Sequence, residues 1–183
     1  MATKRESLPF VGWDVEQRLV CQGAWDACGG PGVVLPSTRI AGGLAWPVVR
    51  WDEPVLRDRL LRGASAVVNR VRVRDWVVQA SGEKLPLELV GFVFTGSLSA
   101  VRTPMSTLAP LGRMVWLSAR VDDWSRWACE LQGAWLVEST NHELVSRGSD
   151  PLELPADVGA VGRRLLGEQL FDLAAREDCL PLG

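Results

Sequence analysis

The sequence predicts an α+β fold in which an antiparallel β-meander, forming a curved sheet or a partly open barrel, follows a short helix and is covered by a C-terminal amphipathic helix. Three observations predict it. The chain of 183 residues has the length of one ordinary domain. Its composition, 47% hydrophobic and 23% charged, is typical of a globular protein and excludes wholesale disorder. Its hydrophobic pattern has a period of two in the middle and a helical period near the C-terminus.

Composition divides the chain into unequal parts. Residues 1–9 have no hydrophobic pattern and predict a flexible tail, whereas residues 10–183 predict a single domain. The first part of that domain, residues 10–51, is rich in Gly, Pro and Trp, and residues 52–183 carry the helix, the meander and the C-terminal helix. Within the first part, residues 15–21 fit a strand and a short helix almost equally well. Short strands are predicted at residues 33–35 and 46–51.

A short helix over residues 53–62 is predicted by the residues at its two ends. Asp52 is a good N-cap and Pro54 suits the first turn. Gly63 suits the left-handed position that follows a helix. The apolar residues between these ends share one face at helical spacing, so the helix is expected to be amphipathic.

The meander is predicted over residues 70–146. Alternation of arginine and valine over residues 70–77 is typical of a half-buried strand, and the apolar run 87–94 is typical of a central strand buried on both faces. The stretch 96–112, rich in Ser, Thr, Pro and Gly, predicts a long loop. The remaining strands are predicted at residues 114–121, 126–139 and 143–146, the first two joined by a polar hairpin tip at residues 122–125.

The last element is predicted as an amphipathic helix over residues 157–175, with Asp157 as its cap. Asp172 and Arg176 are spaced to form an i, i+4 ion pair on its polar face. In the order of its elements, the predicted fold resembles the helix-grip arrangement of START and Bet v 1-like ligand binders. That resemblance implies an apolar ligand cavity between the sheet and the C-terminal helix.

Charge and hydropathy exclude several classes of protein. The formal net charge of −2 is not that of a surface built entirely for nucleic acid or anionic lipid. No apolar run approaches the roughly 18–20 residues of a membrane span, and no apolar segment follows the charged N-terminus, so we expect a cytoplasmic protein with no membrane contact. Lys4 and Lys84 are the only lysines among 20 basic residues, which matches the coding bias of a GC-rich bacterial genome.

Familiar catalytic motifs are missing from the sequence. It contains no P-loop, no GxSxG, no HExxH and no GxGxxG after a predicted strand. His142 is the only histidine, so a Cys-His or Ser-His mechanism must use it. The catalytic alternative makes His142 a general base oriented by Glu143 or Asp123, with Cys129 as the nucleophile. The simpler interpretation places His142 in a polar turn and Cys129 in the core.

Paired carboxylates offer a second catalytic alternative. Asp122 and Asp123 lie at the predicted hairpin tip, and Glu130 and Glu138 share one face of the strand predicted after it. The simpler interpretation is a solvated tip and an exposed strand face. The cysteines form no CxxC pair, so we expect no metal, and no cofactor is predicted. Without a secretory signal, we expect the thiols to be reduced. They are Cys21, Cys28, Cys129 and Cys179.

One candidate binding surface lies on the strand predicted at residues 70–77. Arg70, Arg72 and Arg74 would project from one side of that strand about 6–7 Å apart, with Trp76 next in line. That spacing is close to the phosphate repeat of single-stranded nucleic acid, and a nearby tryptophan would stack on a base. The same alternation also suits a half-buried strand whose arginines pair with acidic residues across the sheet.

A second candidate surface lies at the predicted hairpin tip. Trp124 is expected there in an exposed position, which implies a partner that covers it, and Arg126 follows it. Trp116, Trp127 and Trp135 occur in alternating stretches and are predicted to lie in the core, although Trp127 is also next to the tip.

The function that these features favour is non-catalytic: a protein-interaction or assembly module that binds another protein, or its own copy, through Trp and Arg surfaces. One alternative is a helix-grip binder of a small apolar ligand, and another is a single-stranded nucleic-acid binder. An enzyme comes last. The candidate contact residues are Arg70, Arg72, Arg74, Trp76, Trp124, Arg126 and Trp127.

Overall fold

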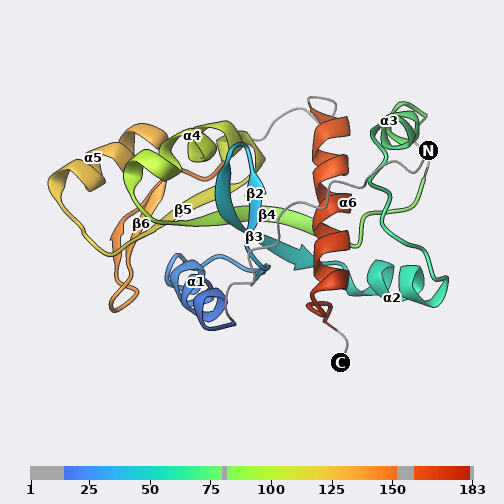
Figure 1. The fold of residues 1–183 in the computed structure, drawn as a ribbon, viewed down its shortest axis with the longest axis horizontal. Helices are drawn as coiled ribbons and strands as arrows, with labels where there is room; N and C mark the ends of the chain where they lie inside the picture. The colour runs from blue at the N-terminus through green and yellow to red at the C-terminus, as the bar shows by residue number, and fades with distance from the viewer. Residues whose placement is uncertain (1–14, 80–81, 152–158, 182–183) are drawn as a thin grey trace, which may run out of the picture.

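The structure, a computed structural model, describes residues 15–79, 82–151 and 159–181. The tail predicted at residues 1–9 and the cap predicted at Asp157 lie outside these ranges. The described helices are α1 (Val15–Ala27), α2 (Glu53–Leu61), α3 (Arg70–Val78), α4 (Leu98–Leu108), the 3-10 turn η1 (Ala109–Leu111), α5 (Asp123–Gln132) and α6 (Ala160–Arg176) (Figure 1). The described strands are β1 (Val33–Val34), β2 (Thr38–Ile40), β3 (Gly43–Trp51), β4 (Leu87–Thr95), β5 (Arg113–Ser118), β6 (Trp135–Glu138) and β7 (Leu144–Ser146).

The strands form one curled, mixed sheet in the order β1-β3-β4-β5-β6-β7, with β2 also paired to β3. The pairs β3–β4 and β6–β7 are antiparallel, as a meander requires, but β4–β5 and β5–β6 are parallel. The α+β class and the curved sheet are therefore confirmed, and the purely antiparallel meander is wrong. Parallel neighbours need a crossover connection, and α4 and α5 supply the two crossovers.

Helix α4 occupies the stretch predicted as a long loop. Its composition, with Pro104 inside the helix, is poor for helix formation. However, Val101, Met105 and Leu108 recur at helical spacing and are buried against the sheet. Burial of this stripe outweighs the weak local preference of the polar residues between them.

Helix α5 replaces the first half of the strand predicted at residues 126–139. The side chain of Asp122 accepts a hydrogen bond from the backbone N–H of Ser125 at 2.8 Å and caps the first turn. Gly133 ends the helix in the left-handed conformation, with φ of 63°. Both signals are present in the sequence, but the alternation of apolar residues favours a strand there.

Helix α3 replaces the strand predicted at residues 70–77. The side chain of Asn69 accepts hydrogen bonds from the N–H groups of Val71 and Arg72, which caps the first turn. Val73 is buried on the side that faces α6, and Val71 on the outer side is exposed. Valines that alternate over a few residues also occur in a helix in which one of them is buried. The prediction of a strand over residues 70–77 was wrong.

Other predicted elements are confirmed. The helix predicted at residues 53–62 is α2, with Asp52 accepting a hydrogen bond from the N–H of Val55 at 3.2 Å. The apolar run 87–94 lies in the central strand β4, and the C-terminal helix is α6, in which Asp172 and Arg176 form the expected ion pair at 3.1 Å. For residues 15–21, which fitted both states, the structure shows helix α1.

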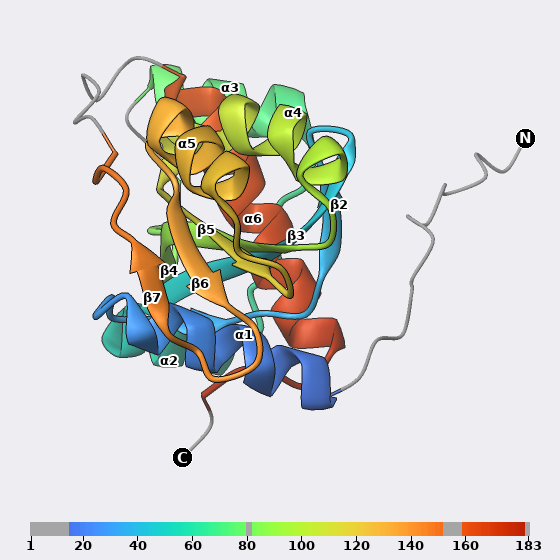
Figure 2. The same cartoon turned by 90° about the vertical axis from the view of Figure 1, so that its left-hand side faces the viewer.

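Helices cover both faces of the sheet (Figure 2). Helix α1 packs on one face, where Val93, Val115 and Val137 point towards it. Helices α4 and α5 pack on the other face, over Phe92, Trp116 and Leu136, which come from the same strands. A third cluster joins α2 and α6 to the ends of β3 and β4. Alternate residues of each strand thus serve opposite layers of the core.

Helix α1 is held on the sheet by Trp25, which is buried above Gly91 of β4. A methyl group on Gly91 would lie 2.4 Å from the carbonyl oxygen of Arg113 and 2.6 Å from the Trp25 ring. The guanidinium of Arg113 lies 4.4 Å from the ring centroid of Trp135 and donates to the carbonyl of Cys28 at 3.0 Å. The absence of a side chain at Gly91 is therefore what allows α1 to approach this closely.

Candidate functional site

An exposed apolar stripe runs along α5. Trp124, Trp127 and Leu131 are spaced by three and four residues, which places them on one face of the helix. Their exposed fractions are 61%, 48% and 66%. The two indole rings stack with centroids 4.6 Å apart and an interplanar angle of 29°. We call these three residues the α5 stripe.

The rest of α5 anchors this stripe to the core. Ser125, Ala128 and Cys129 are buried on the face that packs against the sheet and α4. The cap adds a second hydrogen bond, from the hydroxyl of Ser125 to the carboxylate of Asp122 at 2.7 Å. These hydrogen bonds lower the pKa of Asp122 below its ordinary value, so the cap remains charged at neutral pH. The stripe is thus presented on a helix whose backbone is fixed at both ends.

Charged side chains border the α5 stripe. Asp123, Arg126 and Glu130 are exposed and recur at spacings of three and four, so they form a second line of side chains beside Trp127. The side chains of Arg126 and Glu130 form no ion pair with any residue in the described ranges. The surface is therefore an apolar strip with a polar margin of alternating sign, the arrangement that protein interfaces favour.

A hollow adjoins the C-terminal end of α5. It has a volume of about 540 Å³ and lies between that end of the helix, the 3-10 turn and the segment that follows β7. Leu131 belongs both to its lining and to the α5 stripe, so the two features form a continuous surface. Its other lining residues include Pro110, Met114, Gln132 and Asp150.

The candidate contact residues separate into two groups. Trp124, Arg126 and Trp127 lie together on α5, at one end of the molecule, whereas the four candidates of residues 70–76 lie on α3 towards the other end (Figure 1). Trp127 had been predicted to lie in the core, and its 48% exposure shows that this was wrong. Trp116 and Trp135 are buried, as predicted.

The arginines of α3 do not form the predicted row. Successive arginines at every second position turn by about 200° around a helix, so Arg72 lies on the opposite side from Arg70 and Arg74. Trp76 is also committed to packing, because the guanidinium groups of Arg72 and Arg164 lie 5.1 and 5.5 Å from its ring. The arginines therefore do not form the row at strand spacing that was expected to contact successive phosphates of a nucleic acid.

The structure also separates the catalytic pairs. Cys129 is buried on the inner face of α5, and burial raises the pKa of its thiol to about 12, so it is protonated at neutral pH. His142 lies in the turn between β6 and β7, on the side of α1, where its ring meets Gly23. Glu130 lies on α5 and Glu138 on β6, so they do not share a strand face. Cys129 and His142 therefore lie on opposite sides of the sheet, and Glu130 and Glu138 do not form the predicted strand face.

Two general features of the described residues bear on function. Among them, no group of three or more His, Cys, Asp or Glu side chains is placed to hold a metal ion. No helix in these ranges is long and apolar enough to cross a membrane.

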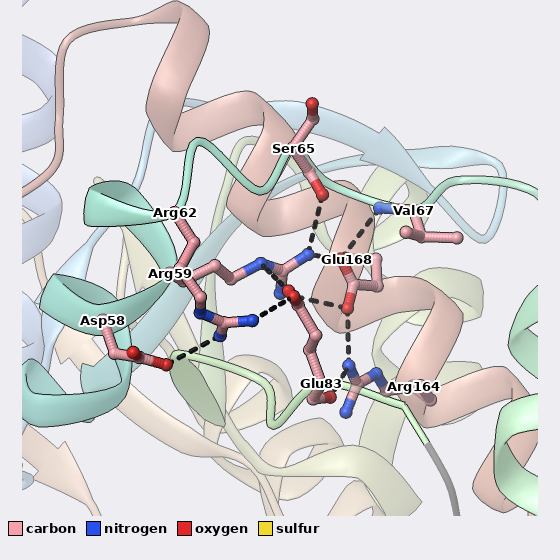
Figure 3. A network of polar contacts seen from close by, with 8 residues as sticks. All are labelled: Asp58, Arg59, Arg62, Ser65, Val67, Glu83, Arg164 and Glu168. Atoms are coloured by element: carbon pink, nitrogen blue, oxygen red, sulfur yellow. Dashed lines mark hydrogen bonds and ion pairs between the residues drawn. The ribbon is translucent and has the colours of Figure 1, made fainter.

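The most deeply buried charges form a network between α2 and α6 (Figure 3). Arg59 donates two hydrogen bonds to the carboxylate of Glu168, at 3.2 and 2.6 Å, and both side chains are inaccessible to solvent. Arg164 and the N–H of Val67 also donate to that carboxylate, at 2.8 and 2.9 Å. Because Arg59 also donates to the carbonyl of Ser65, the pair is surrounded by partners and acts as a clamp, not as an open site.

This network predicts how stability depends on pH. Burial alone raises the pKa of Glu168, but hydrogen bonds from Arg59 and Val67 and the charges of Arg59 and Arg164 outweigh it, so the pKa lies below its ordinary value of 4.5. The carboxylate therefore contributes stability above pH 4.5 that is lost as the pH falls through the folded-state pKa. Urea unfolding between pH 7 and 3 is expected to show a steeper acid loss for wild type than for Glu168→Gln. Parallel curves would contradict it.

A groove that the sequence did not predict lies on the opposite side of the molecule. It has a volume of about 860 Å³ and lies between α2 and the C-terminal segment, with Glu53 and Arg57 in its lining. Leu61, at 83%, and Leu60, at 37%, are exposed there. The adjacent leucines at the end of α2 were the available signal. The apolar lining of this α2 groove consists of Leu56, Leu60, Leu61, Leu180 and Pro181.

No protein-family model, curated protein or solved structure matches this chain.

The exposure of the α5 stripe leads to a stability prediction. Trp124→Ala is expected to lower the free energy of unfolding by less than about 1 kcal/mol, because only the stacking with Trp127 and partial burial are lost. The same substitution at the buried Trp135 is expected to remove about 3–5 kcal/mol. Chemical denaturation of both variants measures the difference. Equal losses would show that Trp124 is a core residue.

Proposed function

We propose that this protein is a non-catalytic interaction module whose α5 stripe docks an apolar helix of a protein partner. The observation that carries the proposal is the stacked pair Trp124 and Trp127, exposed on a helix that is capped at both ends and packed on the core. Two tryptophans that are this exposed contribute little to the core, so their exposure favours a role in binding. Tryptophan and arginine are also the residues most enriched among those that dominate binding energy.

The spacing of the stripe favours a helix as the docked element. Trp124, Trp127 and Leu131 follow the three-and-four spacing by which one helix packs its side chains into another. The bordering charges would lie at the edge of that contact, where they set orientation and partner choice more than affinity. Because the helix backbone is already ordered, docking does not require α5 to fold first.

The small-ligand alternative receives less support from the described residues. The helix-grip resemblance places a cavity between the sheet and the C-terminal helix, but α6 fills that position with packed side chains. Leu170, Phe171 and Ala174 are buried there against Leu35 and Val49 of the sheet layer. The α2 groove lies outside this layer, so it does not replace the implied cavity.

Photocrosslinking in cells of the source organism tests the proposal. A photoreactive phenylalanine analogue at position 127 is expected to give a discrete protein adduct, and the same analogue at the exposed Gln169 of α6 is the matched control. The adduct at position 127 should be lost in a Trp124→Ser background, because that ring forms half of the stripe. Identical adducts at both positions, or none at position 127, would contradict docking at α5.

A further inference from the structure

The α5 stripe protrudes and the α2 groove is hollow, so their shapes are complementary. The two surfaces lie apart on the molecule. The stripe is a raised apolar helix face, and the groove is an open apolar trough lined by leucines. Figure 1 shows α5 at one end of the long axis and α2 towards the other. One molecule therefore cannot fill its own groove with its own stripe, but two molecules in line can do so.

Charge complementarity accompanies the apolar match. On α2, Glu53 precedes Arg57 by four residues, and on α5 Arg126 precedes Glu130 by four, with the signs reversed. Parallel packing of the two helices thus places Glu53 against Arg126 and Arg57 against Glu130 in one register. None of these four side chains forms an ion pair with another described residue of the same molecule, so all are free for this contact.

Parallel pairing of the stripe with its own copy is disfavoured by the same charges. A parallel pair of α5 helices sets each charge beside its own counterpart, whereas an antiparallel pair centred on the stripe sets Arg126 beside Glu130 of the other copy. Like charges that are brought together at an interface weaken it. The observed signs therefore favour α2 over a parallel α5 as the partner helix, and antiparallel pairing of two α5 helices is the competing outcome that a groove variant distinguishes.

We infer that the partner helix of the α5 stripe is α2 of a second copy of this chain, so that the protein assembles head to tail. The inference rests on the proposed function and names its partner. Contacts between unlike surfaces repeat from copy to copy, and they give rings or open filaments instead of a closed dimer. The apolar parts of the contact are small compared with a standard interface, so assembly is expected only at high micromolar concentration or in a scaffolded setting.

Two variants that each disable one surface test the inference. The stripe variant, Trp124→Ser/Trp127→Ser, removes the stripe, and the groove variant, Arg57→Glu/Leu61→Asp, disables the groove. All four positions are exposed, so both variants should fold, and circular dichroism checks this. Sedimentation velocity at concentrations up to about 1 mM should show concentration-dependent multiples of 20.0 kDa for wild type and monomers for each variant alone. Leu19→Asp, at an exposed leucine of α1, is the matched control and should assemble like wild type.

The decisive result comes from mixing the two variants. Each retains the surface that the other lacks, so an equimolar mixture should form a species of twice 20.0 kDa and nothing larger. If the stripe variant is monomeric but the groove variant still assembles, the inference is overturned. In that case α5 docks on another surface, in line with the proposed function. Wild type that remains monomeric overturns the inference, and the crosslinking at position 127 then decides the proposed function separately. Assembly that survives both sets of substitutions also overturns it.

Discussion

Replacing Glu168 with alanine is expected to lower the free energy of unfolding by about 3–5 kcal/mol, an effect as large as that expected for Trp135→Ala. The substitution removes the buried carboxylate partner of the Arg59 guanidinium and leaves, as its only carboxylate contact, the longer one with Glu83, at 3.4 Å. It also removes the acceptor for the N–H of Val67 and for Arg164, so three donors lose their partner together. For a chain of this length, the loss corresponds to a fall in Tm of about 2–4 °C for each kcal/mol. Urea denaturation at pH 7 measures it directly.

Two further variants distinguish two effects on stability, that of the buried Arg59 charge without Glu168 and that of lost packing. In Arg59→Met/Glu168→Leu, both members of the pair become apolar, and replacing a buried ion pair in this way is often neutral. This double variant is therefore expected to be more stable than Glu168→Ala. If it is less stable, the network contributes through its ion pair and the penalty for an unpaired Arg59 is not the dominant effect. Glu83 contacts the same Arg59 from a more exposed position, so Glu83→Ala should have a smaller effect.

The second large effect is expected for Gly91→Ala, at about 3 kcal/mol of lost stability. The added methyl group would lie 2.4 Å from the backbone oxygen of Arg113, which belongs to the paired strand β5 and cannot move alone. It would also lie 2.6 Å from the buried ring of Trp25, the residue that holds α1 on the sheet. Relief of either overlap requires α1 or β5 to shift. Thermal unfolding followed by circular dichroism measures the loss of stability.

The matched control for this methyl group is Gly162→Ala. Gly162 lies inside α6 and a methyl group there would meet no atom within 4 Å, so the substitution should stabilise the protein by about 0.5–1 kcal/mol through helix propensity. Opposite signs for the two glycines would show that steric space, not glycine flexibility, decides the outcome at Gly91. Equal effects of the two substitutions would contradict the close packing of α1 on β4.

These two predictions concern the frame that presents the α5 stripe. The clamp of Arg59 and Glu168 joins α2 to α6, and the approach at Gly91 joins α1 to the sheet on which α5 packs. The proposed interaction surface uses neither site. Variants of the frame are therefore expected to change stability, whereas variants of Trp124 and Trp127 change binding, and the two sets of measurements can be interpreted independently.

Part of the candidate surface was predictable from the sequence. Trp124 was expected to be exposed because it follows two aspartates in a polar segment, and the structure confirms its exposure on α5. Trp127 was assigned to the core because it occurs in an alternating stretch. A helix reverses that conclusion, since residues three apart share a face while alternate residues do not. The capping Asp122 and the terminal Gly133 were the local evidence that would have identified the helix.

Elements whose signals are local or strongly apolar could be identified from the sequence. Capping at Asp52 and Gly63 delimits α2, the continuous apolar run identifies the buried β4, and the long stripe identifies α6. Long-range packing is needed to explain why β4, β5 and β6 run parallel, why α3 is helical, and why Arg59 pairs with Glu168, 109 residues away in the chain. Short apolar patterns suit either period, and the state that forms is the one whose apolar face is covered by segments distant in the chain.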